Sequence, residues 1–269
     1  MTQISYRMLH QALSEFNIAV DAPVIVHTSL SALGRVQGGP DTVIGALLNR
    51  FHSVMMPAFT YKTMIVPETG PEHNGIRYAS AKDINRMALP FHADLTVDKL
   101  MGATAAAMQV YPLAFRSKHP ILSFSGVHVE PGLSAQTPED PFAPIEWMWK
   151  QNGWVLLMGV DHSVNTTIHL AEQMAGRSGF TRWAIMGEKI VVCEHFPGCS
   201  NGFTQAAELL EGISTHVPVG DGQLTALPMQ AMIEILTMHL QEHPVALLCK
   251  DPHCQRCQEY RRRYARKKA

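Results

Sequence analysis

Two short apolar runs near the N-terminus, residues 24–26 and 54–56, flank one segment with a helical apolar pattern. Pro40 suits the first turn of that helix, where the N–H that proline lacks would have no partner. The apolar face of the helix consists of Val43, Ile44, Leu47, Leu48 and Phe51. A strand, a helix and a strand in this order are typical of two parallel strands joined by a crossover. This unit predicts an α/β fold.

The spacing of apolar residues predicts further elements along the chain. Helical spacing occurs at residues 8–16, 97–110, 166–175, 203–211 and 227–240, and strand-like runs occur at 121–126, 154–158, 181–195 and 245–248. Residues 60–90 and 131–144 are rich in proline and polar side chains, which indicates long connections. No internal repeat or linker is visible. We therefore expect residues 1–269 to form a single domain, with a central mixed sheet flanked by helices and long loops forming a cleft.

Composition excludes several classes of protein. The formal net charge of -1 shows no excess of basic residues of the kind that binds nucleic acid. A content of 46% hydrophobic and 17% charged residues is typical of a compact globular protein. No apolar stretch reaches the ~18 residues of a membrane-spanning helix, and the N-terminus lacks the layout of a signal peptide. The five cysteines are an odd number, and three lie near the C-terminus. We therefore expect a cytoplasmic protein without a membrane partner, present as a monomer or homodimer.

The segment after the apolar run at residues 154–158 contains the residues best suited to catalysis. Gly159 ends the run, Asn165 and Thr166 suit a helix N-cap, and a helix is predicted over residues 166–175. Thr166, His169 and Glu172 are three residues apart, so they share one face of that helix. A carboxylate can hold an imidazole in one tautomer and stabilise its protonated form, which suits a general base. The alternative is a capping threonine beside a solvated histidine and glutamate.

The loop between the first strand and its helix, residues 27–39, is rich in glycine, serine and threonine. Such a loop can present backbone N–H groups and hydroxyls to a phosphate. It lacks the lysine of a Walker loop, and its glycines do not follow the dinucleotide-binding spacing. Plain turn chemistry is the alternative interpretation.

The C-terminal residues 249–269 combine cysteines with basic residues. Cys254 and Cys257 have the spacing of a metal knuckle, and with Cys249 and Cys199 they would complete the four ligands of a structural zinc. Cys193, His195 and His253 are other candidate ligands, and reduced structural thiols are the alternative. The basic residues 261–268 are expected to form a solvated or frayed terminus, with contact to phosphate as the alternative.

Several motifs, taken together and in this order, resemble the aminoglycoside 3-N-acetyltransferase family. They are His27-Thr-Ser-Leu, Gly38-Gly-Pro-Asp-Thr-Val, Met56-Pro-Ala-Phe-Thr, Met101-Gly, Arg116-Ser-Lys-His-Pro with Ser123-Phe-Ser, and the run from Leu157 to Glu172. They cover roughly residues 22–248. The resemblance implies a fold unrelated to the common GNAT acetyltransferases and the use of acetyl-coenzyme A to acetylate an amine.

The resemblance also implies roles for residues. His169 matches the catalytic histidine and Glu172 the carboxylate that supports it. The residues that match the coenzyme A side are Thr28, Ser29, Leu30, Arg35, Val36, Gly38, Gly39, Ser123 and Phe124. Because an aminoglycoside is polycationic, its pocket should be acidic, and Glu68, Asp94 and Asp140 are candidate substrate-binding carboxylates from the loops.

The leading hypothesis is an acetyl-CoA-dependent N-acetyltransferase that acts on the 3-amino group of an aminoglycoside and confers antibiotic resistance. Acetylation of another small amine is an alternative. A second alternative is a zinc-dependent amidohydrolase in which His162, His169 and Glu172 bind the metal. A third is a non-enzymatic module that binds nucleic acid through the C-terminal cysteines and basic residues, marked by a steep dependence on salt.

Overall fold

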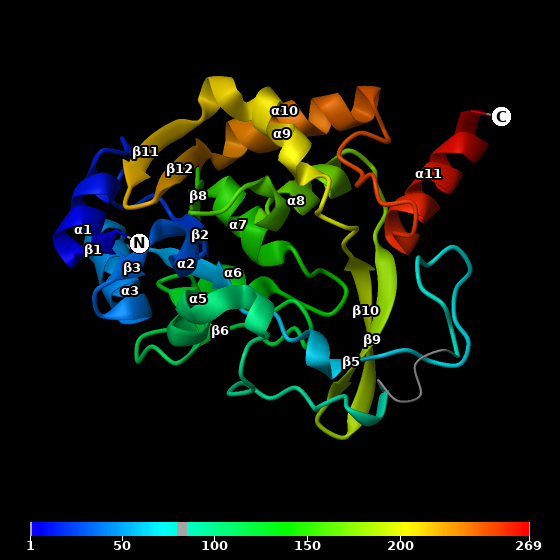
Figure 1. Ribbon diagram of the computed structural model, residues 1–269. Helices are drawn as coiled ribbons and strands as arrows, with labels where there is room; N and C mark the ends of the chain where they lie inside the picture. Colours follow the sequence, from blue (N-terminus) through cyan, green and yellow to red (C-terminus); the bar gives the residue numbers. More distant parts are fainter. Residues whose placement is uncertain (1, 80–84, 269) are drawn as a thin grey trace.

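The centre of the molecule is a seven-stranded mixed sheet, seen in a computed structural model that describes residues 2–79 and 85–268 (Figure 1). Three neighbouring strands run parallel, and the strands outside them run antiparallel to their neighbours. The strand order is β11 (Thr215–Val219), β12 (Gly222–Pro228), β8 (Trp154–Met158), β2 (Val24–Thr28), β4 (Val54–Pro57), β7 (Phe124–Val127) and β6 (Phe115–Arg116). The predicted central mixed sheet is therefore confirmed.

The parallel strands are buried on both faces, which is why their sequences are continuous apolar runs. Successive side chains of a strand point to opposite faces, so Val24 and Val26 join one core cluster while Ile25 joins the other. The first cluster is covered by α1 (Tyr6–Ser14), α3 (Gly39–Arg50) and α5 (Gly102–Gln109). The second is covered by α6 (Glu130–Ala135), α7 (Ala143–Lys150), α8 (Ile168–Met174), α9 (Ala206–Leu210) and α10 (Met229–Glu242). Helices thus flank both faces of the sheet.

The predicted strand–helix–strand unit corresponds to β2, α3 and β4, with Val24 paired to Val54 in a parallel ladder. Later in the chain, β8 pairs in parallel with the opposite edge of β2. The chain therefore crosses from β2 to β4 on one side and later adds β8 on the other side, which opens a crevice beyond the carboxyl ends of the strands. This topology determines where the site lies.

Smaller elements lie around the central sheet. A two-stranded sheet joins β1 (Gln3–Ile4) and β3 (Arg35–Val36), and the short helix α2 (Leu30–Leu33) follows β2. A three-stranded antiparallel sheet joins β10 (Lys189–Phe196), β9 (Phe180–Met186) and β5 (Met64–Ile65). Short 3-10 turns occur at Tyr61–Thr63, Lys99–Met101, His162–Val164, Phe203–Gln205 and Glu211–Ile213. No helix in the described ranges has the length and apolar content to cross a bilayer.

The C-terminal helix α11 (Gln255–Lys268) lies beside β9 and β10 (Figure 1). Tyr260 is only 2% exposed, and its ring lies 4.9 Å from that of Phe180. Arg263 donates to the carbonyl of His73 at 2.6 Å. The expectation of a frayed terminus is therefore wrong, because apolar and arginine contacts hold one side of this basic helix on the protein. The outer side is solvated as expected, since Arg262, Ala265 and Arg266 are exposed.

Three other predictions need correction. Residues 245–248, expected as a strand, form a turn, because the edge of the sheet is occupied by β11 and β12. No strand was expected at β11 and β12, although Gly220 and Asp221 form the kind of two-residue turn that joins hairpin strands. The helix expected over residues 97–110 divides at Gly102, whose φ of 81° belongs to the left-handed region. Part of the long loop expected at residues 60–90, namely 80–84, lies outside the described residues.

Candidate active site

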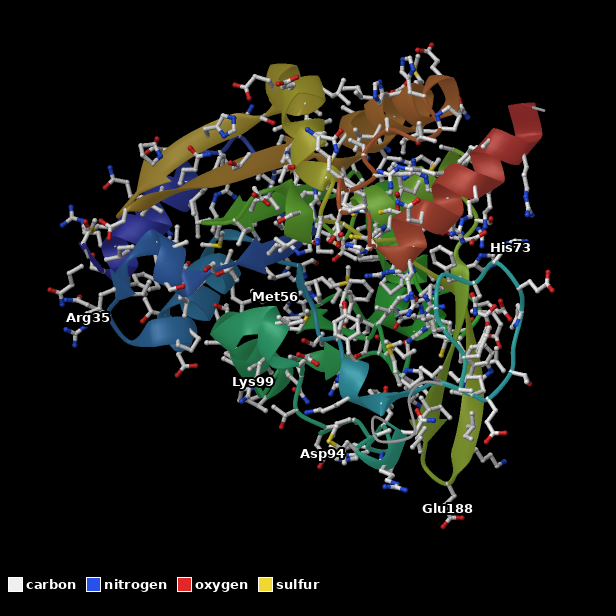
Figure 2. All side chains as sticks on the ribbon, turned by 45° about the vertical axis from the view of Figure 1, so that its right-hand side comes forward. Arg35, Met56, His73, Asp94, Lys99 and Glu188 are labelled. Carbon is white, nitrogen blue, oxygen red and sulfur yellow. The ribbon has the colours of Figure 1, made fainter. Side chains whose placement is uncertain are left out.

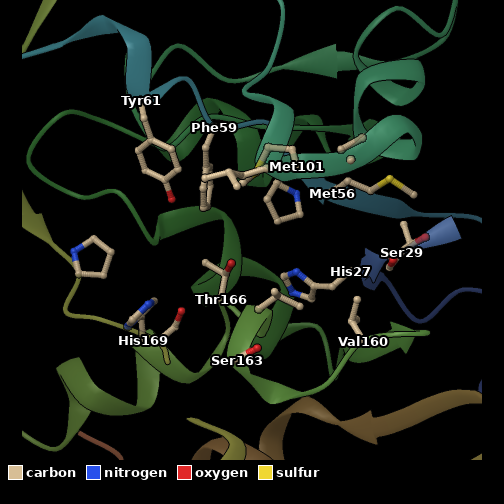
Figure 3. A pocket seen from close by; sticks show the side chains of 18 of the residues that line it. His27, Ser29, Met56, Phe59, Tyr61, Met101, Val160, Ser163, Thr166 and His169 are labelled. Atoms are coloured by element: carbon tan, nitrogen blue, oxygen red, sulfur yellow. The ribbon is translucent and has the colours of Figure 1, made fainter. Parts of the chain in front are cut away.

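A cavity of about 730 Å³ opens at the carboxyl ends of the parallel strands. Its walls include His27 and Thr28 from the end of β2, Met56 from β4, and Val160 just after β8. Figure 3 shows Tyr61, Phe59 and Met101 along one side, with Ser163, Thr166 and His169 along the other. The volume lies within the range of small-molecule pockets, roughly 300–1,000 Å³. The topology of the sheet therefore provides a ligand-sized site.

The segment after β8 carries a histidine into this cavity. Gly159 turns the chain with a φ of 67°, where an added Cβ would lie 3.0 Å from Leu33 and from the Ser29 carbonyl. The Asn165 side chain then accepts from the N–H of Thr167, and α8 begins at Ile168. His169 lines the cavity while only 7% exposed. The helix begins about two residues later than predicted.

His169 and Glu172 form a buried pair. The Nδ1 atom of His169 lies 2.6 Å from Oε2 of Glu172, and Glu172 is 4% exposed. The shared helix face predicted for His169 and Glu172 is confirmed, whereas Thr166, predicted on the same face, precedes α8. Because Nδ1 contacts a carboxylate, it carries the proton in the neutral ring, and Nε2 keeps its lone pair.

Arg177 completes this group from a position that the sequence did not indicate. It donates Nη1–H to Oε1 of Glu172, and Nη2–H to the carbonyls of Pro244 and Ala246, both at 2.8 Å. Burial alone would raise the pKa of Glu172, but His169 and Arg177 outweigh it and the pKa is lowered. Glu172 is therefore a carboxylate near neutral pH. Arg177 follows the helix across a glycine turn, so helical spacing gave no signal for it.

Two aromatic rings hold the His169 ring in place. Phe142 stacks on it with ring centroids 5.8 Å apart, and Phe203 lies at 4.8 Å. Both phenylalanines are buried in the core. Packing from two sides and the bond to Glu172 leave the imidazole with one orientation.

The floor of the cavity contains two polar atoms that have no hydrogen-bond partner. They are Nε2 of His27 and Oγ1 of Thr28, both buried. Burial, with a smaller contribution from nearby His162, lowers the pKa of His27 to about 3, so its ring is neutral. Buried polar groups are normally satisfied. These two atoms therefore lack a partner within the protein, at residues that line the cavity.

The buried histidines make the stability of the fold sensitive to acid. Burial lowers the pKa of His27 to about 3 and that of His119 to about 4. Below their unfolded pKa of 6.5 the unfolded chain binds protons that the folded chain excludes, so stability falls as pH falls. We expect the two residues together to lower the free energy of unfolding by about 4 kcal/mol between pH 7 and pH 5, as measured by urea unfolding.

The variant His119→Asn tests whether the buried histidines cause this loss of stability in acid. Nδ1 of His119 accepts from the N–H groups of Ile121 and Leu122, at 3.1 and 2.9 Å. In His119→Asn the amide oxygen can accept the same bonds without titrating, so about half of the acid effect should disappear. A free energy of unfolding that does not change between pH 7 and pH 5 in the unmodified protein would contradict the interpretation.

The residues predicted on the coenzyme side separate into two groups. Thr28, Ser29 and Leu30 line the cavity. Ser123 instead donates to the Ala58 carbonyl at 2.7 Å, and Phe124 packs in the core. Gly38 and Gly39 lie where α3 begins, and Arg35 and Val36 form β3. Figure 2 shows Arg35 at the outer edge of the molecule, whereas Met56, which lines the cavity, lies toward the centre.

The three predicted substrate carboxylates lie outside the cavity lining. Glu68 is exposed on its loop, and Asp140 lies in a turn with Thr137. Asp94 is solvent-exposed at the periphery (Figure 2), where it pairs with His92 at 2.7 Å. Among the described residues that line the cavity, none is an aspartate or glutamate.

A second, shallower hollow of about 440 Å³ adjoins the cavity. The two share Ser29, Val160, Ser163 and Val164, so they lie side by side. Asp161 lines the second hollow, where its carboxylate accepts from the N–H of Ser163 at 2.8 Å. This exposed aspartate therefore supplies a negative charge beside the histidine segment.

The four cysteines predicted as zinc ligands come together. Their sulfur atoms lie within 4.8 Å of one another at Cys199, Cys249, Cys254 and Cys257, and none is in a disulfide. Over the described ranges this is the one group of three or more candidate ligands close enough for a shared metal. His162 contacts Asn165, and Glu172 is engaged by His169 and Arg177. The three ligands of the amidohydrolase hypothesis are therefore not gathered around one point.

Comparisons of sequence agree with this geometry. Residues 25–241 match the model of the aminoglycoside 3-N-acetyltransferase family. The aminoglycoside N(3)-acetyltransferase IX of Micromonospora chalcea is 32% identical over 163 residues, and enzyme VII of Streptomyces paromomycinus is 30% identical over 164 residues. These alignments cover 56% and 58% of this chain and 56% of each relative. The chain thus spans little more than half the length of these relatives.

Solved structures show the same fold over most of the chain. The AAC(3)-IVa apoenzyme has a TM-score of 0.78 at 22% identity and covers 97% of both chains. A histidine-to-alanine mutant of that enzyme in complex with a gentamicin also has a TM-score of 0.78, at 21% identity over 97% of this chain and 98% of the other. AAC-IIIb in a binary complex with CoASH has a TM-score of 0.75 at 17% identity over 90% of this chain and 98% of the other.

An α/β fold whose parallel strands open into a cavity with a buried histidine–carboxylate pair defines a site suited to proton transfer. The chain belongs to the aminoglycoside 3-N-acetyltransferase family.

Proposed function

We propose that this protein transfers the acetyl group of acetyl-CoA to the 3-amino group of an aminoglycoside and so confers resistance to the antibiotic. The observation that carries the proposal is the His169–Glu172 pair at the wall of a ligand-sized cavity, in a chain of this family. Relatives of the same fold bind CoASH and a gentamicin. Both kinds of ligand are therefore compatible with this architecture.

The chemistry needs a base because an amine is protonated near neutral pH and cannot attack a thioester until it loses a proton. The acceptor of that proton is Nε2 of His169, the ring nitrogen that does not contact Glu172. The neutral amine nitrogen then bonds to the thioester carbonyl carbon and releases a second proton to solvent, and the carbon–sulfur bond breaks as the tetrahedral adduct collapses. The imidazolium returns the proton to the departing thiolate, so no covalent enzyme intermediate is needed.

Glu172 and Arg177 act through the histidine. The carboxylate of Glu172 stabilises the imidazolium that forms during the reaction, because opposite charges 2.6 Å apart attract strongly in a buried site. Arg177 in turn keeps Glu172 ionised and oriented. Both are positioning residues rather than groups that touch the substrate.

Thr28, Ser29 and Leu30 are the strongest candidates for contacts to the coenzyme, since they line the cavity and Oγ1 of Thr28 has no partner. A ligand in the second hollow would lie next to one in the cavity, because the two hollows share lining residues. The cationic acceptor would find its negative charge at Asp161 rather than at the predicted Glu68, Asp94 and Asp140. We therefore propose Asp161 as a contact to a substrate ammonium group.

The test is a transfer assay with the purified protein, acetyl-CoA and a panel of aminoglycosides, simple diamines and amino acids, analysed by mass spectrometry. We expect the mass of an aminoglycoside to rise by one acetyl group, and fragmentation to place that group on the 3-amino nitrogen. Acetylation of simple amines alone would support the other substrate class, and no transfer by folded protein that binds coenzyme A would refute the proposal.

Three further expectations belong with this proposal. All five cysteines are free of disulfides, which supports a reducing compartment such as the cytoplasm. We also expect the protein to be a monomer or homodimer and to form a single domain; both stay predictions.

A further inference from the structure

The four-cysteine cluster lies against the wall of the active-site cavity. Cys199 itself lines the cavity, together with its neighbours from Phe196 to Asn201. Cys249 lies after α10, Cys254 directly precedes α11, and Cys257 lies in the first turn of α11. Two stretches of the chain that are separated by α9, β11, β12 and α10 therefore meet at one group of sulfur atoms.

We propose that Cys199, Cys249, Cys254 and Cys257 bind a zinc ion that fixes the wall of the cavity at residues 196–201. The existence of the metal site is independent of the proposed acetyl transfer; its effect on coenzyme binding rests on that function.

The sulfur geometry suits zinc. A tetrahedral ion with Zn–S distances of about 2.3 Å requires sulfur atoms about 3.8 Å apart. All four sulfur atoms already lie within 4.8 Å of one another, so small side-chain rotations suffice. Cys254 directly precedes α11 and its carbonyl accepts from the N–H of Gln258, so its side chain and that of Cys257 in the first turn reach the same point. Four soft thiolates in a tetrahedron favour zinc or iron, and oxygen-seeking ions are excluded.

Backbone groups hydrogen-bond to two of the four sulfur atoms. The backbone of Asn201 hydrogen-bonds to Cys199, and that of Asp251 hydrogen-bonds to Cys249. Each of these backbone groups lies two residues after the cysteine it contacts. Such hydrogen bonds to a metal ligand orient its sulfur atom. Four thiolates and Zn²⁺ carry a net charge of about −2, which the start of α11 and the nearby Arg256 can offset. Zinc would release the thiol protons to solvent on binding.

The contacts around the cluster connect it to the cavity and to the catalytic pair. Arg256, which also lines the cavity, donates to the carbonyls of Pro197 and Gly198 at 3.3 and 2.8 Å. Arg261 donates to the carbonyl of Cys249 at 2.6 Å. Just before Cys249, the carbonyls of Pro244 and Ala246 hold Arg177, which holds Glu172. Losing the ion would therefore loosen both the cavity wall and the segment that supports Arg177.

The first experiment measures metal in the untagged, full-length protein purified with a reductant, using elemental analysis by mass spectrometry. We expect about one zinc ion per chain. In Cys254→Ser the affinity for zinc should fall on the order of 100-fold or more, because even changes outside the ligands lower metal affinity about 10- to 100-fold. Cys193→Ala is the control: burial raises the pKa of Cys193 to about 12, it lies outside the cluster, and its zinc content should equal that of the unmodified protein.

The second experiment asks whether the ion supports the cavity wall. Limited proteolysis and the thermal midpoint should show a loosened C-terminal region in Cys254→Ser, and calorimetry should show weaker binding of coenzyme A than in Cys193→Ala. Zinc absent from the reduced protein, iron in its place, or zinc retained by Cys254→Ser would overturn the metal site. Stoichiometric zinc without any acetyl transfer would leave the metal site standing and refute only the proposed function. Unchanged coenzyme binding after loss of zinc would overturn the coupling to the cavity wall.

Discussion

Replacing His169 with alanine is expected to reduce turnover by at least about 100-fold, the lower end of the contribution of a positioned general base. The reason is that Nε2 of His169 is the free nitrogen of a ring fixed by Glu172, Phe142 and Phe203 at the wall of the cavity. Without it the substrate ammonium must lose its proton to water. Steady-state kinetics with acetyl-CoA and an accepted aminoglycoside measure the effect.

Two variants separate the chemistry from the fold. His243→Ala removes an exposed histidine at the end of α10 and should leave turnover unchanged. Glu172→Gln should lower turnover less than His169→Ala, because the base remains and only the support for its charged form is weakened. Near-normal turnover in His169→Ala, at unchanged coenzyme affinity, would remove this residue from the mechanism.

Arg177→Met should have the largest effect on stability, a loss of about 3–5 kcal/mol in the free energy of unfolding. Glu172 would become a buried charge without its arginine partner, and the carbonyls of Pro244 and Ala246 would lose their donor. For a chain of this size the loss corresponds to a fall of roughly 10 °C in Tm. Urea unfolding and calorimetry both measure it.

The matched control is Arg7→Met, since Arg7 is exposed on α1 and should change stability by less than about 0.5 kcal/mol. In the double variant Glu172→Leu with Arg177→Met, the buried charge is absent and part of the lost stability should return. An Arg177→Met protein that unfolds at the same urea concentration as the unmodified one would show that the ion pair has little structural role.

Local sequence patterns predicted the elements whose causes are local. Continuous apolar runs indicated the buried parallel strands, and Pro40 with its apolar face indicated α3. The three-residue spacing of His169 and Glu172 was sufficient to predict their contact, because both lie on one helical face. The Cys254–Cys257 spacing likewise indicated a knuckle, and Cys199 and Cys249 do join it.

Contacts between distant segments were decided by the tertiary structure. Residues 245–248 are as apolar as a strand, yet β11 and β12 occupy the available edge of the sheet. The basic composition of the C-terminal residues predicts a solvated terminus, but the packing of Tyr260 on Phe180 holds one side of α11 against the protein. Which loops line the cavity depends on where the strands end, and so Asp161 lies beside it while Asp94 does not.

The sequence by itself determined the α/β class, the histidine–glutamate pair and the family resemblance, because each depends on spacing within one short segment or on motif order. Only the tertiary structure decided that Arg177 supports Glu172, that His27 and Thr28 have free polar atoms, and that the cysteines border the cavity. The physical reason is that burial and partnership come from packing between segments, which no local periodicity encodes.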